Sequence, residues 1–380
     1  MNRRNAGKSA LLFLAVCFVA WCARPFSTDA EKWGEAVLLI HILGAQRIVP
    51  THLYVADGTG MYAMQIDAGT GALFNRTGPF GAGNAPTSIV TSTDNKELFV
   101  GSSTANQGMY AFSLATPLYP TPVAGSPFDA GVSLSGLSIS SKYLYATPGS
   151  SLVRAYNLNT ASGALTAVSG SPFGVGCVSR IQVDPQSRFI FTNDGIANLT
   201  QSYPLNSSGG IVTGSMTQVS GFGSSMATDS EGKRLFVNVP GGSIPNMRVF
   251  DINQSTGVLT AASGSPYSLT GAAINVGQIA VDPRGRFVYI LNTTSGGIFG
   301  FHMNNNSGSL TPISSNALVA VTTPTSLHIT ADGGYIYTAT GTGTSIAGFK
   351  INNDGSLTMV TTITGVGAGN VGISSRFDVQ

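Results

Sequence analysis

Charge is scarce in this 380-residue chain, because Asp, Glu, Lys and Arg together make up only 9% of it. A soluble globular protein usually carries about 25%. The formal net charge is +2, and Lys and Arg form no long run. A nucleic-acid-binding surface needs a basic patch or stripe, so we expect no nucleic-acid partner.

Cysteine is also rare. Cys17 and Cys22 lie in an apolar N-terminal stretch, which leaves Cys177 alone in the body of the chain. One cysteine cannot form an internal disulfide, and neither Cys nor His recurs at the spacing of a metal site. We therefore expect no metal and no cofactor.

Glycine, by contrast, is abundant, with 48 residues, and hydrophobic residues reach 42%. High Gly with little charge is typical of short strands joined by tight turns. The chain is long enough to bury a large core. The composition therefore favours an all-β protein.

The N-terminus has the pattern of an export signal. Arg3, Arg4 and Lys8 precede an apolar run over residues 10–23, which is short for a transmembrane helix. Residues 1–23 are thus predicted to be a signal peptide cleaved after Cys22, with an uncleaved anchor or a lipidated Cys22 as alternatives. A spacer over 24–50, either a short helix or unstructured, would then lead to one domain over 51–380. We expect an exported protein, periplasmic, cell-surface or secreted, with membrane contact only through such an anchor.

The strongest signal is internal repetition. A strand of alternating aliphatic and aromatic residues recurs seven times, every 45 to 53 residues. The second residues of the copies are Leu53, Leu98, Leu144, Ile190, Leu235, Val288 and Ile336. Such a period is that of propeller blades. The sequence predicts a seven-bladed β-propeller with four antiparallel strands per blade.

The order of the strands also predicts how the ring closes. The first repeat lacks an innermost strand, and a matching segment appears at residues 370–374. The C-terminal strand should therefore join the N-terminal blade, and deleting residues 370–380 should collapse the fold. Gly-Ser-Pro-aromatic segments, such as the one at 170–173, are interpreted as ends and turns of outer strands.

Residues 281–289, Val-Asp-Pro-Arg-Gly-Arg-Phe-Val-Tyr, resemble the repeat of the lactonase-type, "YVTN" seven-bladed propellers, and so does the Thr-Gly-Val-Leu-Thr turn at 256–260. The resemblance covers roughly residues 51–380. It implies a 6-phosphogluconolactonase-like fold and, for the family's enzymes, hydrolysis of a sugar lactone with His, Arg and Glu around the central channel. At the positions matching the family's His, this chain has Arg180 and Gln278.

The candidate site residues lie in loops predicted to form one rim of the channel. Arg180 is a candidate to bind a carboxylate or phosphate, and Asp194 to act as base, which makes these two the catalytic candidates. The substrate-binding candidates are Asn193, Asn275, Gln278 and Asn292. An alternative is that Asn193 and Asp194 only close a turn.

Several other polar residues are expected to be structural. His328 should form a hydrogen bond between blades, His302 should pack within a strand, and His52 should be exposed. A further set is interpreted as solvated turn residues on the opposite face: Lys142, Arg188, Lys233, Arg284 and Arg286.

Two functions fit these observations. The first is a lactonase-like hydrolase that opens a sugar lactone at the channel. The second is a non-catalytic exported propeller that binds a carbohydrate or an extracytoplasmic protein. In both cases we expect a monomer.

Overall fold

The computed structural model describes residues 48–380, except 105–106, 177, 179, 222, 240–245, 270–275, 295, 315–316, 341–344, 367–371 and 380. The predicted signal or anchor lies outside the described residues, as does most of the spacer. The first strand, β1, already begins at Ile48, ahead of the predicted domain start at residue 51.

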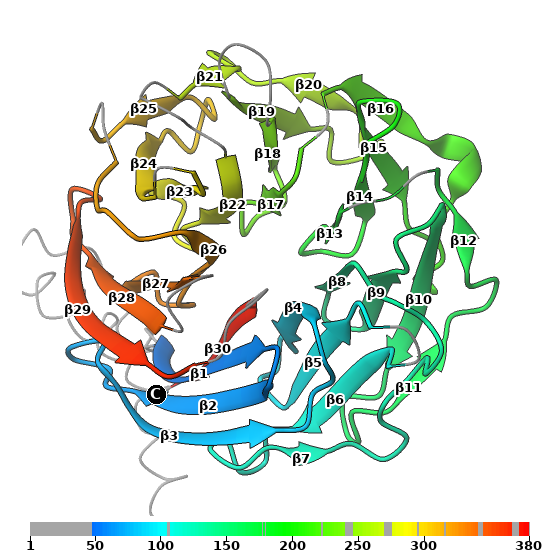
Figure 1. Ribbon diagram of the computed structural model, residues 1–380. Coiled ribbons are helices and arrows are strands. Elements are labelled where there is room, and N and C mark those ends of the chain that lie inside the picture. Colours follow the sequence, from blue (N-terminus) through cyan, green and yellow to red (C-terminus); the bar gives the residue numbers. More distant parts are fainter. Residues whose placement is uncertain are drawn as a thin grey trace, which may run out of the picture. The chain divides into compact units, whose positions relative to one another are not determined.

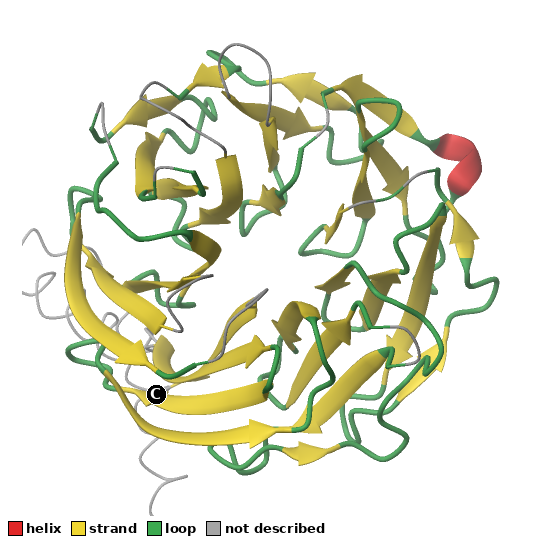
Figure 2. Ribbon diagram, viewed as in Figure 1, coloured by secondary structure: helices red, strands yellow, loops and turns green. Residues whose placement is uncertain are grey.

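The described chain is built of strands, and its helical content is the short 3-10 segment η1 (Thr213–Ser215) (Figure 2). Within the described residues we find no helix with the length and apolar character needed to cross a membrane.

Seven antiparallel sheets are arranged around a ring, and each contains a path of four strands (Figure 1). The predicted seven-bladed propeller is therefore confirmed.

Blades one to seven follow the chain order of their second strands, and the strands of each layer are given in that order. The innermost strands are β30 (Gly372–Val379), β4 (Pro86–Thr91), β8 (Gly136–Ile139), β13 (Arg180–Val183), β17 (Met226–Thr228), β22 (Val276–Val281) and β26 (Pro324–Ile329). The second strands are β1 (Ile48–Asp57), β5 (Glu97–Ser102), β9 (Tyr143–Thr147), β14 (Phe189–Asp194), β18 (Arg234–Val239), β23 (Phe287–Asn292) and β27 (Tyr335–Thr340).

The two outer layers complete each blade. The third strands are β2 (Gly60–Ile66), β6 (Met109–Ser113), β10 (Leu152–Leu158), β15 (Leu199–Pro204), β19 (Asn246–Ile252), β24 (Ile298–Met303) and β28 (Ser345–Ile351). The outermost strands are β3 (Leu73–Phe80), β7 (Thr121–Pro122), β11 (Leu165–Ala167), β16 (Thr217–Ser220), β20 (Leu259–Ala261), β25 (Leu310–Pro312) and β29 (Leu357–Thr364). Two short strands, β12 (Phe173–Gly174) and β21 (Tyr267–Ser268), add a second outer piece to blades three and five.

The Gly-Ser-Pro-aromatic segments belong to these outer strands, as predicted. In three blades the serine hydroxyl accepts a backbone N–H of the third strand at 3.0 Å. The donors are Ala111, Ala155 and Val249, and the acceptors are Ser126, Ser171 and Ser265. The segment thus satisfies a strand donor where the outer strand is interrupted.

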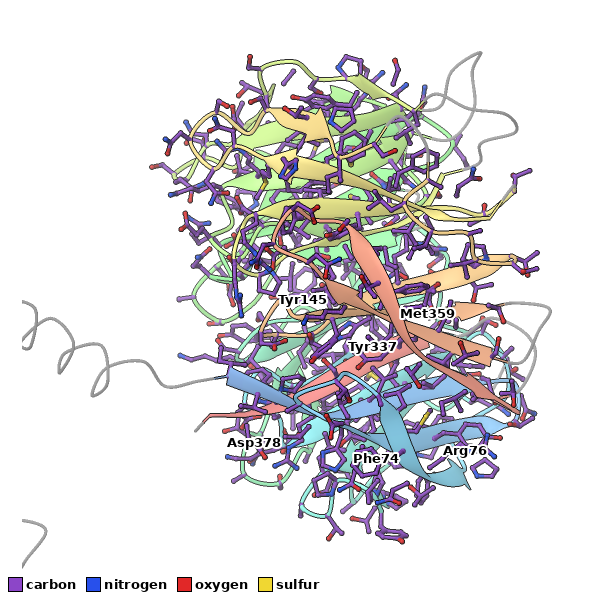
Figure 3. All side chains as sticks on the ribbon, turned by 90° about the vertical axis from the view of Figure 1, so that its left-hand side faces the viewer. Phe74, Arg76, Tyr145, Tyr337, Met359 and Asp378 are labelled. Atoms are coloured by element: carbon purple, nitrogen blue, oxygen red, sulfur yellow. The ribbon has the colours of Figure 1, made fainter. Side chains whose placement is uncertain are left out.

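The ring closes through the two ends of the domain. Strand β30 pairs antiparallel with β1, with Val55 opposite Ile373 and Leu53 opposite Ser375. Blade one therefore takes its inner strand from the C-terminus, as the sequence predicts. At the outer edge of the same seam, Arg76 donates to the carbonyl oxygens of Thr364 and Gly365, both at 2.9 Å. Figure 3 views this seam, with Phe74 and Arg76 on β3 and Met359 on β29.

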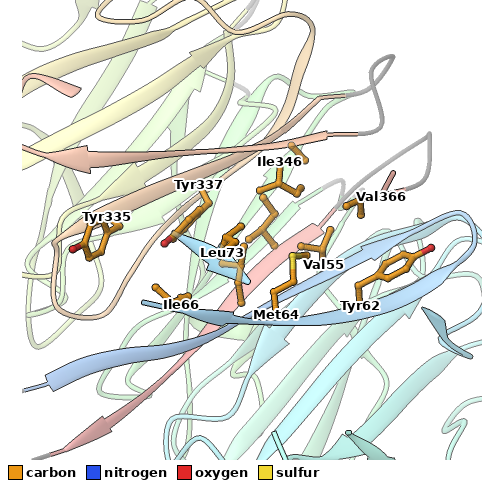
Figure 4. Packing of buried hydrophobic residues seen from close by; sticks show 12 residues of the cluster. Val55, Tyr62, Met64, Ile66, Leu73, Tyr335, Tyr337, Ile346 and Val366 are labelled. Carbon is orange, nitrogen blue, oxygen red and sulfur yellow. The ribbon is translucent and has the colours of Figure 1, made fainter. Parts of the chain in front are cut away.

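Both faces of a second strand are buried, because each blade is packed between two others. Leu53 and Val55 pack in one cluster with Tyr337 and Ile346 of blade seven (Figure 4). The alternate residue Tyr54 joins a cluster with blade two. The central residues of the second strands are therefore mostly apolar, as expected of strands buried on both faces, and polar residues lie mainly toward the strand ends.

A repeated hydrogen bond joins neighbouring blades. Tyr145, Tyr289 and Tyr337 each donate a hydroxyl hydrogen bond of 2.8 to 3.0 Å to the carbonyl oxygen of a turn glycine in the next blade. For Tyr337 the acceptor is Gly71, which has φ +75° and whose added Cβ would lie 2.3 Å from the Tyr335 ring. The recurring turn therefore requires glycine for both its conformation and its close approach.

Candidate functional site

A cavity of about 970 Å³ lies at the centre of the ring. It is lined by residues in or just before the innermost strands of all seven blades, together with Ser103, Gly149 and Thr293, which follow second strands. Because every blade contributes, residues far apart in the sequence surround one space.

The described lining is rich in hydroxyl groups and nearly uncharged. Its serine and threonine residues are Thr87, Ser88, Ser103, Ser133, Ser135, Ser138, Ser224, Ser225, Thr293, Thr325 and Ser326. Arg180 is the one charged residue among the described lining residues, and Gln182 and Gln278 supply amides. This set can bind a hydroxylated ligand through hydrogen bonds and an anionic group through Arg180.

Arg180 begins the innermost strand of blade four and contacts both neighbouring blades. Its Nε donates to the carbonyl oxygen of Ser224 in blade five at 3.0 Å, and its Nη1 to that of Ser135 in blade three at 3.4 Å. Burial in the channel wall lowers the pKa of Arg180. Since an arginine starts from a very high pKa, it remains a cation at neutral pH.

Gln278 also lines the channel, as the sequence analysis placed it. Its Oε1 accepts the backbone N–H of Leu327 at 2.9 Å, which links blades six and seven. Arg180 and Gln278 are therefore two sequence-predicted site residues that the structure brings to one cavity.

Asn193 and Asp194 are not among the channel-lining residues. Asn193 is fully buried and donates through Nδ2 to the carbonyl oxygen of Gly223 in blade five at 2.6 Å. Asp194 accepts the backbone N–H groups of Ile196 and Ala197, both at 2.9 Å. Asp194 thus closes a turn, as in the alternative interpretation, whereas Asn193 joins two blades, which neither interpretation included.

The remaining two substrate-binding candidates, Asn292 and Asn275, are not found in the described channel lining. Asn292 is buried, and its Oδ1 accepts the N–H of Thr294 at 3.1 Å. It is likewise not among the channel-lining residues. Asn275 lies outside the described residues.

The three histidines of the domain lie away from the described channel lining. His328 Nε2 lies 2.7 Å from the Ser375 hydroxyl, which joins blade seven to blade one as predicted. Burial lowers the pKa of His328 to about 4. The ring of His302 packs 5.4 Å from that of Phe287, centroid to centroid.

The prediction that His52 is exposed is wrong. It is half-buried on β1, directly opposite Arg376 of β30. Burial, and secondly the charge of Arg376, lower its pKa to about 4. The sequence predicted the pairing of the C-terminal strand with this blade, but not that it places Arg376 beside His52.

The interpretation of Arg188 and Arg286 as solvated is also wrong. Each pairs with a fully buried aspartate four residues earlier, Arg188 with Asp184 at 2.8 Å and Arg286 with Asp282 at 2.6 Å. Each also donates to a glycine carbonyl oxygen of the next blade. The recurring Asp-Pro-x-x-Arg segment is therefore an inter-blade clamp. Lys142, Lys233 and Arg284 are exposed, as predicted.

The serine and threonine hydroxyls around the channel were not among the predicted site residues. Ser135 and Ser224 stand just before an innermost strand, and Thr325 is at the start of one. The recurrence of small hydroxyl residues at that place in the repeat is the signal that could have found them. Across the described part of the chain, no group of three or more His, Cys, Asp or Glu is placed to hold a metal ion.

Comparison with known proteins gives a family and a fold. Residues 129–368, more than half of the chain, match the family described as "Lactonase, 7-bladed beta-propeller". A search of curated proteins found no match.

Solved structures agree at low identity. The periplasmic gluconolactonase PpgL of Pseudomonas aeruginosa is 15% identical, with a TM-score of 0.69 over 87% of this chain and 99% of that one. A protein titled a putative 6-phosphogluconolactonase, from Bacteroides fragilis, is 15% identical, with a TM-score of 0.67 over 86% of this chain and 98% of that one. These likenesses show the fold.

Proposed function

The chain belongs to the lactonase family of seven-bladed β-propellers, and from this premise we propose that it opens a sugar lactone in its central channel. The observation that carries the proposal is the position of Arg180. It brings a cation to a cavity otherwise lined by hydroxyl and amide groups, and two neighbouring blades hold its guanidinium.

The proposed chemistry is attack of water or hydroxide on the lactone carbonyl carbon. The carbonyl electron pair moves onto oxygen, and the tetrahedral intermediate collapses with cleavage of the ring C–O bond. The ring oxygen takes up a proton, and the product is an open-chain hydroxy acid. Arg180 would stabilise the negative charge that develops on the carbonyl oxygen.

The described channel lining offers hydroxyls, amides and one guanidinium, and none of these is a base at neutral pH. The attacking oxygen must then lose its proton to solvent, or arrive as hydroxide. We therefore expect kcat/KM to rise with hydroxide concentration across about pH 6–8, without the plateau that a side-chain base of nearby pKa would produce.

The test is hydrolysis of glucono-δ-lactone and 6-phosphogluconolactone by the full chain, corrected for spontaneous opening at each pH. Arg180→Ala should lower kcat/KM at least about 100-fold, because it removes a charged donor to the oxyanion. Arg284→Ala is the matched control, since it removes the same charge from an exposed turn away from the cavity lining.

A second candidate function is carriage or sensing of a sugar or sugar acid without catalysis. The hydroxyl-rich composition of the described lining favours it, because binding requires no base. No turnover above the spontaneous rate, together with ligand binding that Arg180→Ala abolishes, would replace the hydrolase by this function.

Export and a monomeric state stay proposals. The basic and apolar N-terminus supports export, and one structural neighbour is a periplasmic gluconolactonase. Cell fractionation tests the first proposal and gel filtration the second.

A further inference from the structure

We infer that the channel binds the open-chain hydroxy acid, as its carboxylate anion, in preference to neutral sugars and lactones of similar size. The inference rests on the proposed function only in placing the ligand in the central channel. It adds the charge class of the ligand and makes the reaction product the tighter-binding species.

The charge of the channel lining favours an anionic ligand. Arg180 is the one ionised group among the described lining residues, so the described lining carries one positive charge and no negative one. Arg180 keeps exposed surface in the channel, so a ligand there can contact it, and the burial of the rest of the side chain in the wall lowers its pKa. A carboxylate bound there replaces lost water with a charge-assisted hydrogen bond, whereas a neutral carbonyl replaces it only in part.

The way in which Arg180 is held favours a planar carboxylate. The Nε and Nη1 atoms of Arg180 are held by carbonyl oxygens of blades five and three, at 3.0 and 3.4 Å. These contacts fix the plane of the guanidinium between two blades. A fixed guanidinium loses little conformational entropy when a planar carboxylate binds, which favours a carboxylate as partner.

The hydroxyl groups of the lining favour an open-chain polyol as the rest of the ligand. Hydroxyl groups of Ser135, Ser224 and Thr325 recur at or just before the start of the innermost strands of three different blades. They surround a cavity of about 970 Å³, which is large for one sugar ring. An open-chain polyol reaches several of these hydroxyls at once, while its carboxylate end stays at Arg180.

A single cation also separates two classes of anion. A phosphate group carries nearly two negative charges at neutral pH and is usually bound by several donors or cations. One arginine neutralises a monocarboxylate fully and a phosphate dianion only by half. We therefore expect gluconate to bind at least as tightly as 6-phosphogluconate.

The experiment is calorimetric titration of the full chain with gluconate and with sorbitol, which differ only at the carbon that bears the carboxylate. Gluconate should bind at least about tenfold more tightly at low salt. In Arg180→Gln the two affinities should fall within about twofold of each other, while Arg284→Gln should keep the wild-type difference. Methyl glucoside serves as a stable neutral ring and should bind no better than sorbitol.

A second measurement needs no variant. Raising the salt concentration from about 0.02 to 0.2 M should weaken gluconate binding and leave sorbitol binding unchanged, because salt screens only the charged contact. Equal affinities for the two ligands, no gluconate binding at millimolar concentration, or a gluconate preference that survives in Arg180→Gln would each overturn the inference.

The outcomes separate this inference from the proposed function. Lactone turnover without a gluconate preference leaves the hydrolase and removes the inference. A gluconate preference without turnover keeps the inference and removes the hydrolase.

Discussion

A tyrosine follows the recurring aliphatic residue of the second strand in four blades, and its hydroxyl does not have the same hydrogen-bonding role in all of them. Tyr145, Tyr289 and Tyr337 donate to a glycine carbonyl of the next blade. Tyr54 occupies the same place in blade one, but blade two has Ala-Thr-Pro-Leu at 115–118 in place of the glycine turn. The hydroxyl of Tyr54 is buried beside the Arg376 side chain, and its contact with that side chain falls short of a well-formed hydrogen bond.

This difference predicts opposite results for one substitution at two equivalent sites. Tyr337→Phe removes a buried hydrogen bond to Gly71 and should lower the free energy of unfolding by about 1 kcal/mol. Tyr54→Phe removes a buried hydroxyl that has no well-formed hydrogen bond, only the contact with Arg376, and should leave stability unchanged or raise it. Urea denaturation of both variants measures the difference. A clear loss of stability in Tyr54→Phe would show that its hydroxyl is satisfied, for example by a buried water molecule.

At the scale of elements, strand β30 connects several blades. It completes the sheet of blade one and pairs with β1 from Ile48 to Ala56. Its Ser375 also contacts His328 of blade seven, and the Arg376 side chain donates to the Leu114 carbonyl oxygen of blade two at 2.9 Å. One C-terminal strand thus joins three blades.

Removing residues 372–380 should therefore abolish the cooperative unfolding transition. The deletion exposes the inner edge of β1 and the apolar cluster around Leu53, and an open edge invites aggregation. Differential scanning calorimetry and gel filtration measure the outcome. A truncated chain that still unfolds cooperatively near the wild-type temperature would contradict the role assigned to β30.

At the scale of the whole molecule, the two partly buried histidines make ring closure sensitive to acid. His52 lies opposite Arg376, and His328 contacts Ser375, so both touch β30 at adjacent residues. Their pKa values are lowered from 6.5 to about 4 in the folded protein. Between these two pH values the unfolded chain binds more protons than the folded one, so stability falls as the pH drops from 6.5 to 4.

The expected loss across this window is about 3 kcal/mol from His328, with a smaller amount from the less buried His52. Glu97 and Asp229 act in the opposite direction, because burial raises the pKa of both carboxyl groups. The free energy of unfolding is therefore measured at pH 7 and at pH 4.5 for wild type and for His328→Gln. The loss between the two pH values is then compared between the two proteins. The variant should lose less stability on acidification, and an unchanged pH dependence would contradict the assignment.

The sequence by itself determined the repeat number, the strand order, the closure of the ring and the structural nature of the Gly-Ser-Pro segments. These features depend on local patterns, since strand alternation, turn residues and the missing first strand can all be counted along the chain. The position of Arg180 and Gln278 at the channel followed from the same count, because both lie at the start of innermost strands.

Only the tertiary structure decided which polar residues face the channel and which face another blade. Arg180 and Asn193 are opposite one another on adjacent strands, yet Arg180 lines the cavity and Asn193 is buried against blade five. The clamp formed by Arg188 and the position of Arg376 beside His52 also depend on tertiary structure. Each depends on a neighbouring blade about 45 residues away or at the far end of the chain, and the pattern of a single repeat does not contain that neighbour.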